Sequence, residues 1–424
     1  MTTFSRYQKF VIAMLAFLQF TIVLDFMILS PLGAVLLRDL GITTSQFGLV
    51  VSVYAFSAGI AGLLTAGFAD KFDRKRLLLF FYSGFVLGTF LCAVATSYHF
   101  LLAARIVTGL FGGVIGSISF AIITDLFHLE VRGRVMGVVQ TAFAASQVMG
   151  IPLGLFLANH LGWHAPFFMI VGVSAAVGIC IAVVLQPINQ HLRVASEHNP
   201  LRHLVKTVSQ RRYIQVFAAT ILLATGGFML MPFGSAFTVH NLGISLASLP
   251  IVYMITGVVS IISGPLLGRL SDAVGKYAVF CGGSAVGMVM VGIYCNLGVT
   301  PIGWVIAINA VLFAAIMARM ISVSALTSAV SDLKDPGAFM AISASLQQLS
   351  GGVASAIAGL IVVQSADGRL VHYNILGFVV MGAMAITVGM LYPIQRAVKL
   401  KLSAAASSSS VASGGPTSLP QTDG

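Results

Sequence analysis

Charge is what this sequence lacks most. Only 8% of its 424 residues are charged, against roughly 25% in an ordinary soluble domain, while 58% are apolar. A soluble chain of this length could not cover its surface with so few charged side chains, which excludes a soluble enzyme, a disordered chain and a nucleic-acid binder. The composition favours a polytopic all-α membrane protein in a lipid bilayer.

Residues that a metal, a disulfide or a nucleotide would need are also scarce. The four cysteines, Cys92, Cys180, Cys281 and Cys295, lie inside or at the ends of apolar runs and lack metal-ligand spacing, so neither disulfides nor a metal site is expected. No Gly-x-x-x-x-Gly-Lys-Ser/Thr loop is present, which excludes ATP as the energy source of this chain. We expect no enzymatic activity and no cofactor.

Long apolar runs dominate the chain instead. A membrane-spanning helix needs about 20 apolar residues, and these runs lack the period-2 alternation of a membrane β-barrel. The first run is too long for a signal peptide and contains an aspartate. Twelve spans are predicted: 9–37, 45–68, 77–97, 99–125, 134–159, 164–186, 213–239, 246–270, 276–297, 301–330, 337–364 and 371–396.

The distribution of positive residues predicts the orientation. If the N-terminus is cytoplasmic, the inside segments carry 19 of the 23 Lys and Arg residues, and the outer loops carry only Arg38 and Arg369. This asymmetry predicts that both termini are cytoplasmic. It also explains the net charge of +11 by contact with anionic lipid and the cytoplasm rather than with nucleic acid.

The chain divides into two similar halves. Pro31 has a counterpart in Pro232, at an offset of 201 residues, and Asp70 has one in Asp272, at an offset of 202. Two parallel halves predict a transporter whose site lies between them near the membrane midplane. The predicted units are a six-helix half over 1–186, a cytoplasmic linker over 187–212, a second six-helix half over 213–397 and a disordered cytoplasmic tail over 398–424.

Three motifs carry a family resemblance. The loop 66–76 resembles the signature between the second and third spans of the major facilitator superfamily, with Ala66 and Asp73 in place of its glycines. The segment 105–109, Arg-Ile-Val-Thr-Gly, resembles the fourth-span motif of drug:proton antiporters. The segment 150–154, Gly-Ile-Pro-Leu-Gly, resembles their fifth-span motif and its sugar-efflux variants. The resemblance implies the major facilitator fold and proton-coupled efflux.

Asp25 and Arg105 are the candidate proton-coupling residues. Asp25 is the one acid deep within a predicted span, and a charge at the bilayer centre costs roughly 2.5–3.5 kcal/mol on insertion scales, so such a residue usually has a function. Burial favours the protonated carboxyl, which suits a proton carrier; a structural ion pair is the alternative. Arg105 comes to a similar depth and is the natural partner, unless it snorkels to the outer surface. The family resemblance makes it part of proton coupling.

Polar and pliable residues of the spans are candidates to line a substrate cavity. Arg319 is the buried cation of the second half and could bind either an anionic substrate group or the carboxylate of Asp332. The amides could bind substrate or neighbouring helices, and the apolar members could line a cavity or face lipid. The set is Phe26, Met27, Gln140, Gln147, Met229, Phe233, Arg319, Gln347 and Gln348.

A conformational latch is expected at the inner ends of the helices. Asp70 can cap a helix of the other half, where the helix dipole favours an anion, and the family pattern places Arg74 beside Asp125. Asp272 is the second-half counterpart of Asp70. We expect these contacts to hold an outward-open state until Asp25 titrates. Three prolines are expected to bend their spans near the cavity: Pro31, Pro152 and Pro232.

These features together predict a secondary active transporter. The leading hypothesis is a monomeric, proton-coupled exporter of drug-like or sugar-like small molecules in the bacterial inner membrane, working by alternating access. The alternative is a proton- or anion-coupled importer of a small organic nutrient, in which Arg105 and Arg319 would bind the substrate.

Overall fold

The fold is helical apart from one short hairpin. In the hairpin, β1 (Val363–Gln364) pairs antiparallel with β2 (Leu370–Val371). The structure is a computed structural model, and it describes residues 4–65, 71–189, 192, 211–330 and 336–413.

The first half of the chain forms helices α1 to α8. Local capping fixes two of the starts: the hydroxyl of Ser5 accepts a hydrogen bond from the Gln8 backbone, and the carboxylate of Asp73 accepts one from the Arg76 backbone. Asp73, which replaces a glycine of the loop signature, is thus the N-cap of its helix. The bounds are α1 Arg6–Ile28, α2 Gly33–Asp39, α3 Thr44–Thr65, α4 Arg74–Ala93, α5 Tyr98–Leu126, α6 Leu129–Ala145, π-helical η2 Ser146–Gly150, α7 Ile151–Leu161 and α8 Ala165–Val184.

The second half repeats this order of elements. Most of the predicted linker, 190–191 and 193–210, lies outside the described residues. The bounds are α10 Arg211–Leu230, the 3-10 helix η4 Met231–Phe233, α11 Gly234–His240, the 3-10 helix η5 Leu246–Ser248, α12 Leu249–Val274, α13 Lys276–Tyr294, α14 Ile302–Val330, α15 Pro336–Ile361 and α16 Tyr373–Ser413.

Three predicted spans are broken at their prolines. Pro31 lies in the turn between α1 and α2, Pro232 lies in η4 between α10 and α11, and Pro152 follows the π-helical turn η2 at the start of α7. Proline lacks an N–H group and clashes with the preceding turn, so the regular helix ends or changes there. The breaks at Pro31 and Pro232 occupy matching places in the two halves.

The helices suit a bilayer in length and surface. Within the described residues, eleven segments are long and apolar enough to span a membrane. Large apolar side chains cover the outside of the bundle; Phe17, Phe80 and Phe378 are 58%, 61% and 58% exposed, as expected where lipid replaces water. The 26-residue helix α15 is not among the eleven, so the twelfth span remains a prediction.

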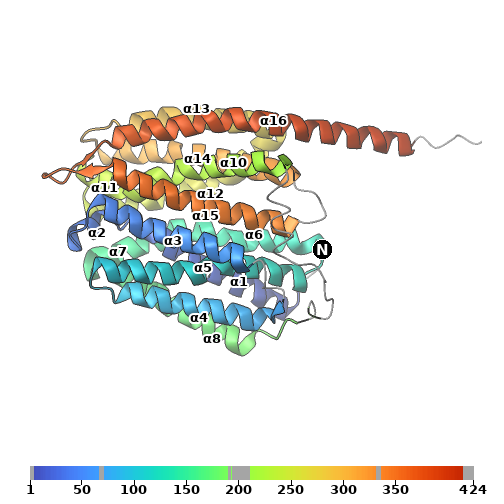
Figure 1. Ribbon diagram of the computed structural model, residues 1–424, viewed down its shortest axis with the longest axis horizontal. Helices are drawn as coiled ribbons and strands as arrows, with labels where there is room; N and C mark the ends of the chain where they lie inside the picture. The colour runs from blue at the N-terminus through green and yellow to red at the C-terminus, as the bar shows by residue number, and fades with distance from the viewer. Residues whose placement is uncertain (1–3, 66–70, 190–191, 193–210, 331–335, 414–424) are drawn as a thin grey trace, which may run out of the picture.

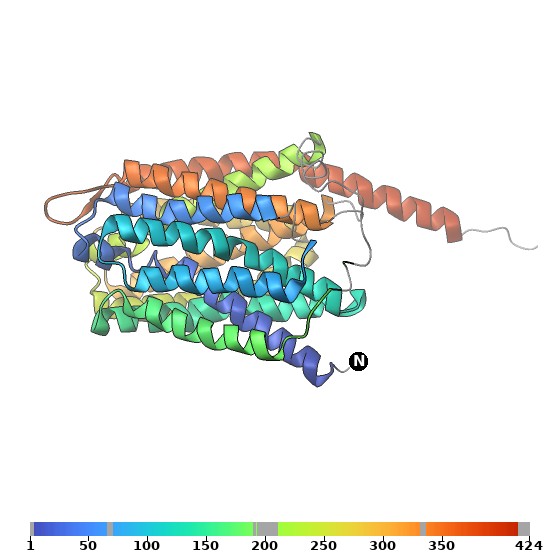
Figure 2. The same ribbon diagram turned by 60° about the horizontal axis from the view of Figure 1, so that its bottom comes forward.

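The C-terminal tail differs from the prediction. Helix α16 continues to Ser413, so residues 398–413 are helical where disorder was predicted. Alanine has the strongest helix propensity and serine is tolerated, which lets the Ala- and Ser-rich segment extend the preceding helix. Figures 1 and 2 show the N-terminus and the projecting end of α16 at the same end of the bundle. The charge pattern predicts that this end is cytoplasmic; we call the opposite end the outer end.

Two helix pairs join the halves. Figure 1 shows first-half and second-half helices in two groups, with α3 and α15 side by side between them. A Cβ atom on Gly48 would lie only 2.8 Å from the carbonyl oxygen of Ser355, so glycine is what permits this approach. At the other seam, a Cβ on Gly257 of α12 would lie 2.9 Å from Val148 Cγ2 in η2. These two seams define the interface between the halves.

Within the first half, α5 packs closely on α3 through two glycines. A Cβ on Gly109 would lie 2.5 Å from the carbonyl oxygen of Tyr54, and one on Gly113 would lie 2.4 Å from Ala58 Cα. Gly116 lies on the same helix, but a Cβ there would meet nothing within 4 Å. The contact with α3 therefore depends on the first two positions.

We predict that Gly113→Leu destabilises the protein and that Gly116→Leu does not. Leucine at 113 would force α5 away from the backbone of α3, and overpacking of this kind costs about 1–3 kcal/mol or more. The check is the thermal unfolding midpoint of the two purified variants in detergent. Equal midpoints would show that the glycine contact does not hold these helices together.

Candidate functional site

Asp25 and Arg105 form an ion pair inside the first half. Asp25 lies on α1 and has no solvent exposure, and Arg105 lies on α5 with 1%. The Arg105 Nη1 atom donates to Asp25 Oδ2 at 2.8 Å. The two predicted proton-coupling residues are thus brought together, and Arg105 does not snorkel to the surface. Removing one partner of such a buried pair typically costs about 3–5 kcal/mol, because the other charge is left uncompensated.

Two further residues complete the surroundings of the pair. Thr89 of α4 donates its hydroxyl to Asp25 Oδ1 at 3.2 Å, and the Arg105 guanidinium carbon lies 4.3 Å from the ring centroid of Tyr54 on α3. The side chain of Asp25 is therefore held by α4 and α5, while Arg105 also contacts α3. Sequence reasoning missed both residues. Thr89 shares a buried helix face with Phe85 and Cys92, a pattern that also fits ordinary packing.

The pair leaves one polar atom unused. Arg105 Nε is buried and has no hydrogen-bond partner among the described residues, so the guanidinium makes one strong contact to Asp25 and rests on an aromatic face. A ring face attracts a cation without giving it a counter-charge. The charge of Arg105 is therefore balanced chiefly by a single carboxylate, and protonation of that carboxylate would remove the balance.

An aromatic contact links the pair to the second half. Phe26, next to Asp25, lies 5.4 Å from the Tyr54 ring and 5.6 Å from the Phe228 ring of α10, centroid to centroid. Rings at these separations attract one another. Phe26 is half-buried; its neighbours in the predicted set, Met27 and Met229, are 6% and 1% exposed. A change at Asp25 can thus reach the second half through Phe26.

The other predicted cavity residues do not share one environment. Gln140 is exposed and Gln147 is buried, although a spacing of seven residues places them on nearly the same face of a helix. Gln347 and Gln348 are half-buried on α15. The structure does not bring the four amides together as a group.

Phe233 and Arg319 lie elsewhere. Phe233 is fully buried near the outer end, where its ring centroid lies 5.8 Å from that of Phe47 on α3. Arg319 is 4% exposed on α14, and its guanidinium carbon lies 5.4 Å from the ring centroid of Phe280 on α13. Its predicted alternative partner, Asp332, lies outside the described residues.

Hydrogen bonds join the two halves at the outer end. The Ser30 hydroxyl donates to the carbonyl of Met231, and the Ser235 hydroxyl donates back to the carbonyl of Ser30 at 2.8 Å. Both hydrogen bonds are accepted by backbone carbonyl groups at the helix breaks near Pro31 and Pro232. Further bonds cross the seams from Thr44 to Val362, at 2.6 Å, and from Asn159 to Leu246, at 2.9 Å. The outer ends of the two halves are therefore in direct contact.

At the inner end, Arg74 and Asp125 form the expected ion pair. Arg74 Nε lies 3.1 Å from Asp125 Oδ2, and the Arg74 side chain is only 7% exposed. The pair ties the start of α4 to the end of α5. Both partners belong to the first half, so this contact does not itself bridge the halves. Asp272 is exposed on α12, and Asp70 lies outside the described residues.

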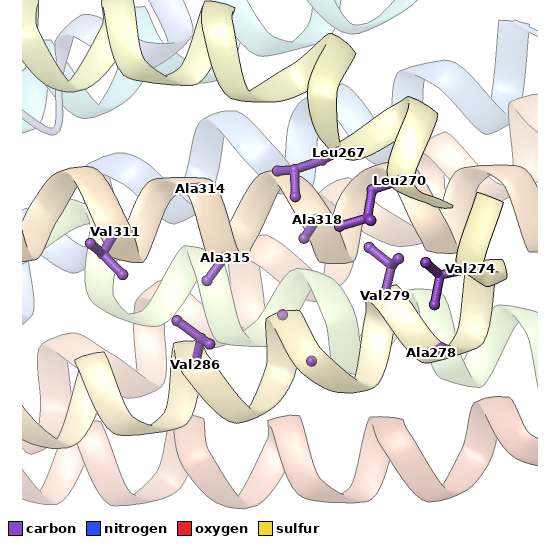
Figure 3. A pocket seen from close by; sticks show the side chains of 12 residues that line it. Leu267, Leu270, Val274, Ala278, Val279, Val286, Val311, Ala314, Ala315 and Ala318 are labelled. Atoms are coloured by element: carbon purple, nitrogen blue, oxygen red, sulfur yellow. The ribbon is translucent and has the colours of Figure 1, made fainter. Parts of the chain in front are cut away.

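A separate apolar groove lies between α12, α13 and α14 (Figure 3). It has a volume of about 390 Å³ and is lined by leucine, valine, alanine and glycine, among them Leu267, Val279 and Ala318. None of the predicted site residues lines it. Without a polar side chain it cannot orient a polar substrate, and its place on the outside of the bundle suits an acyl chain. Within the described residues, no group of three His, Cys, Asp or Glu could hold a metal ion.

Comparison with known proteins places the chain in a family. The sequence profile of the Major Facilitator Superfamily matches residues 15–359. An uncharacterized MFS-type transporter of Bacillus subtilis, YceJ, is 26% identical over 62% of this chain and 67% of its own length. A probable sugar efflux transporter of Mannheimia succiniciproducens is 25% identical over 68% of both chains. Multidrug resistance protein 3 of Bacillus subtilis is 33% identical over 33% of this chain and 27% of its own.

Solved structures share the fold. A bacterial homolog of the human lysosomal transporter Spinster superposes with a TM-score of 0.68 at 15% identity, covering 94% of this chain and 97% of that one. The nucleoside transporter NupG superposes with a TM-score of 0.69 at 15% identity, covering 91% and 99%. At this identity the likeness concerns the fold alone. With the profile match over most of its length, the chain belongs to the Major Facilitator Superfamily and is a multi-pass membrane transporter.

Proposed function

We propose that the protein is a proton-coupled exporter of small molecules in the bacterial inner membrane. The observation that carries this proposal is the buried pair of Asp25 and Arg105, in which one carboxylate balances one guanidinium away from solvent. An acid in this position can change its charge only together with a change in its surroundings. The names of the sugar efflux and multidrug resistance relatives support the direction of transport.

The proposed cycle begins with a proton on Asp25. A neutral carboxyl keeps the hydrogen bond from Thr89 but loses its electrostatic hold on Arg105. α1 and α5 are then free to shift, and Phe26 passes the shift to Phe228 in the second half. The proton leaves when the site faces the cytoplasm. The membrane potential supplies about 2.3 kcal/mol per charge for each 100 mV, so one proton can drive a substantial substrate gradient.

Alternating access needs a closure at each end of the bundle. We assign the outer closure to the bonds between Ser30, Met231 and Ser235. At the inner end, Arg74 and Asp125 are paired while the outer ends are in contact, so their pair alone cannot distinguish the two states. The inner latch therefore depends on Asp70, which would have to reach the second half. Twelve spans, cytoplasmic termini, two six-helix halves and a monomer complete the proposal.

The outer closure makes a prediction for Ser235→Ala. Losing the bond to Ser30 should weaken the closed form by about 1 kcal/mol, which is roughly a fivefold shift towards outer opening. The check is the distance distribution between probes incorporated as unnatural amino acids at Thr96 and Val299, exposed positions in outer loops of the two halves. Ser245→Ala is the matched control, because that hydroxyl bonds only to Ser248 in its own half. If Ser235→Ala and Ser245→Ala give the same distance distribution, Ser235 does not contribute to the outer closure.

The proposed function itself is tested with Asp25→Asn in proteoliposomes. Asparagine keeps the size of the side chain but cannot carry the proton, so proton flux driven by drug-like compounds or sugars should fall to the background of empty vesicles. The measurement is the internal pH of the vesicles after addition of each compound outside. Movement of protons and substrate in opposite directions indicates an exporter.

Two variants make the result interpretable. Asp367→Asn changes an exposed acid in the outer hairpin and should transport normally. The double change Asp25→Asn with Arg105→Gln removes both charges, so it should recover the stability that the single change loses, without recovering proton flux. Wild-type proton flux in Asp25→Asn would refute the role of this residue.

A further inference from the structure

Arg319 is a buried cation with no acidic partner among the residues that the structure describes. Its side chain is 4% exposed, its Nε is buried with no hydrogen-bond partner, and it forms no ion pair with any acid in the described part of the chain. Its guanidinium rests on the ring face of Phe280. In the first half, the corresponding interior cation is paired with Asp25 at 2.8 Å. Within the described residues, the second half thus holds a guanidinium in its interior with no carboxylate beside it.

The internal repeat shows where that carboxylate is missing. The offset of 201 residues that relates Pro31 to Pro232 also relates Asp25 to Gly226. A Cβ atom on Gly226 would lie 4.0 Å from Arg319 Nη1 and 3.8 Å from Val380 Cγ1. Both are ordinary contact distances, so a methyl group fits at this position in contact with Arg319. The counterpart of the one acid within the first half's spans therefore lies directly beside Arg319 and carries no side chain.

A partner from the end of the same helix is too far away. Helix α14 continues from Arg319 to Val330, which carries the chain roughly 16 Å along the helix axis at 1.5 Å per residue. An arginine side chain does not bridge that distance while α14 remains helical. Among the described residues no acid balances this charge, which leaves it available to an anionic ligand.

We propose that Arg319 binds the carboxylate of an anionic substrate beside Gly226. The planar guanidinium matches a carboxylate in a bidentate pair, and a single positive charge balances a monoanion. Phe228, two residues beyond Gly226, packs against Phe26 at the contact between the halves. Phe228 points from a different face of α10 than Gly226, so the proposal specifies only the carboxylate of the substrate. This inference rests on the proposed function only in that the bound molecule is the one transported.

The test compares carboxylates with their neutral amides. Binding of naphthoate, naphthamide, benzoate and benzamide to the purified full chain in detergent is measured by titration calorimetry. At least one carboxylate should bind about tenfold more tightly than its amide, since a hydrogen bond to a charged group contributes that much. Arg319→Gln should abolish the preference. Gly226→Asp should abolish it too, by placing an internal carboxylate beside Arg319.

Gly226→Ala is the matched control. Its methyl group fits at 4.0 Å from Nη1 without taking the place of a carboxylate, so it should keep the preference. If Arg319→Gln fails to fold, the comparison of Gly226→Asp with Gly226→Ala still decides. Equal affinity for acids and amides in the wild type, or a preference that persists in Gly226→Asp, overturns the inference. Detergent binding needs no gradient, so loss of the proton-coupling claim would leave this test unaffected.

Discussion

The ion pair between Asp25 and Arg105 is the constraint on which the first half depends. Neither charge could remain in an apolar bundle alone, so each needs the other at hydrogen-bond distance. This requirement brings α1 and α5 together, and Thr89 adds α4 through the second carboxylate oxygen. The close approach of α5 to α3 at Gly109 places the Tyr54 ring under the guanidinium. Three helices thus meet at one carboxylate and a fourth, α3, contacts its partner Arg105, so a single proton would alter the contacts of all four.

The two halves repeat the same architecture but differ in their chemistry. Both break a helix at the same proline position, and the backbone exposed at the two breaks is used for the bonds that join their outer ends. In the interior, the first half holds an acid and a base, whereas the second holds Arg319 opposite Gly226. In the proposed mechanism this asymmetry divides two tasks that a transporter must link, with proton uptake in the first half and binding of an anionic group in the second.

The sequence alone predicts the features that follow from composition and from how deep a residue lies within a membrane span. Apolar length located the helices, and the rarity of charge singled out Asp25 and Arg105 as partners. Arg74 and Asp125 could be paired only through the family resemblance. Thr89 and Tyr54 could not be found in this way, because neutral residues in a buried helix carry no signal of a specific partner. The different environments of Gln140 and Gln147 could not be predicted, because a spacing of seven residues shows a shared helix face but not which part of that face is covered. The helical extension to Ser413 came from local propensity in a segment that has no apolar period.

The most direct test of this account is infrared difference spectroscopy of the carboxyl groups as a function of pH. We expect a protonated-carboxyl band that appears on acidification, is absent in Asp25→Asn, and persists to higher pH in Arg105→Gln because the nearby cation that favours the charged form is gone. Arg105→Lys keeps the positive charge but loses the planar guanidinium, so its carboxyl band should persist to a pH between those of the wild type and Arg105→Gln. An Asp25 band whose pH dependence is the same with and without Arg105, or no Asp25 band at all, would contradict the claim that this pair is the proton switch.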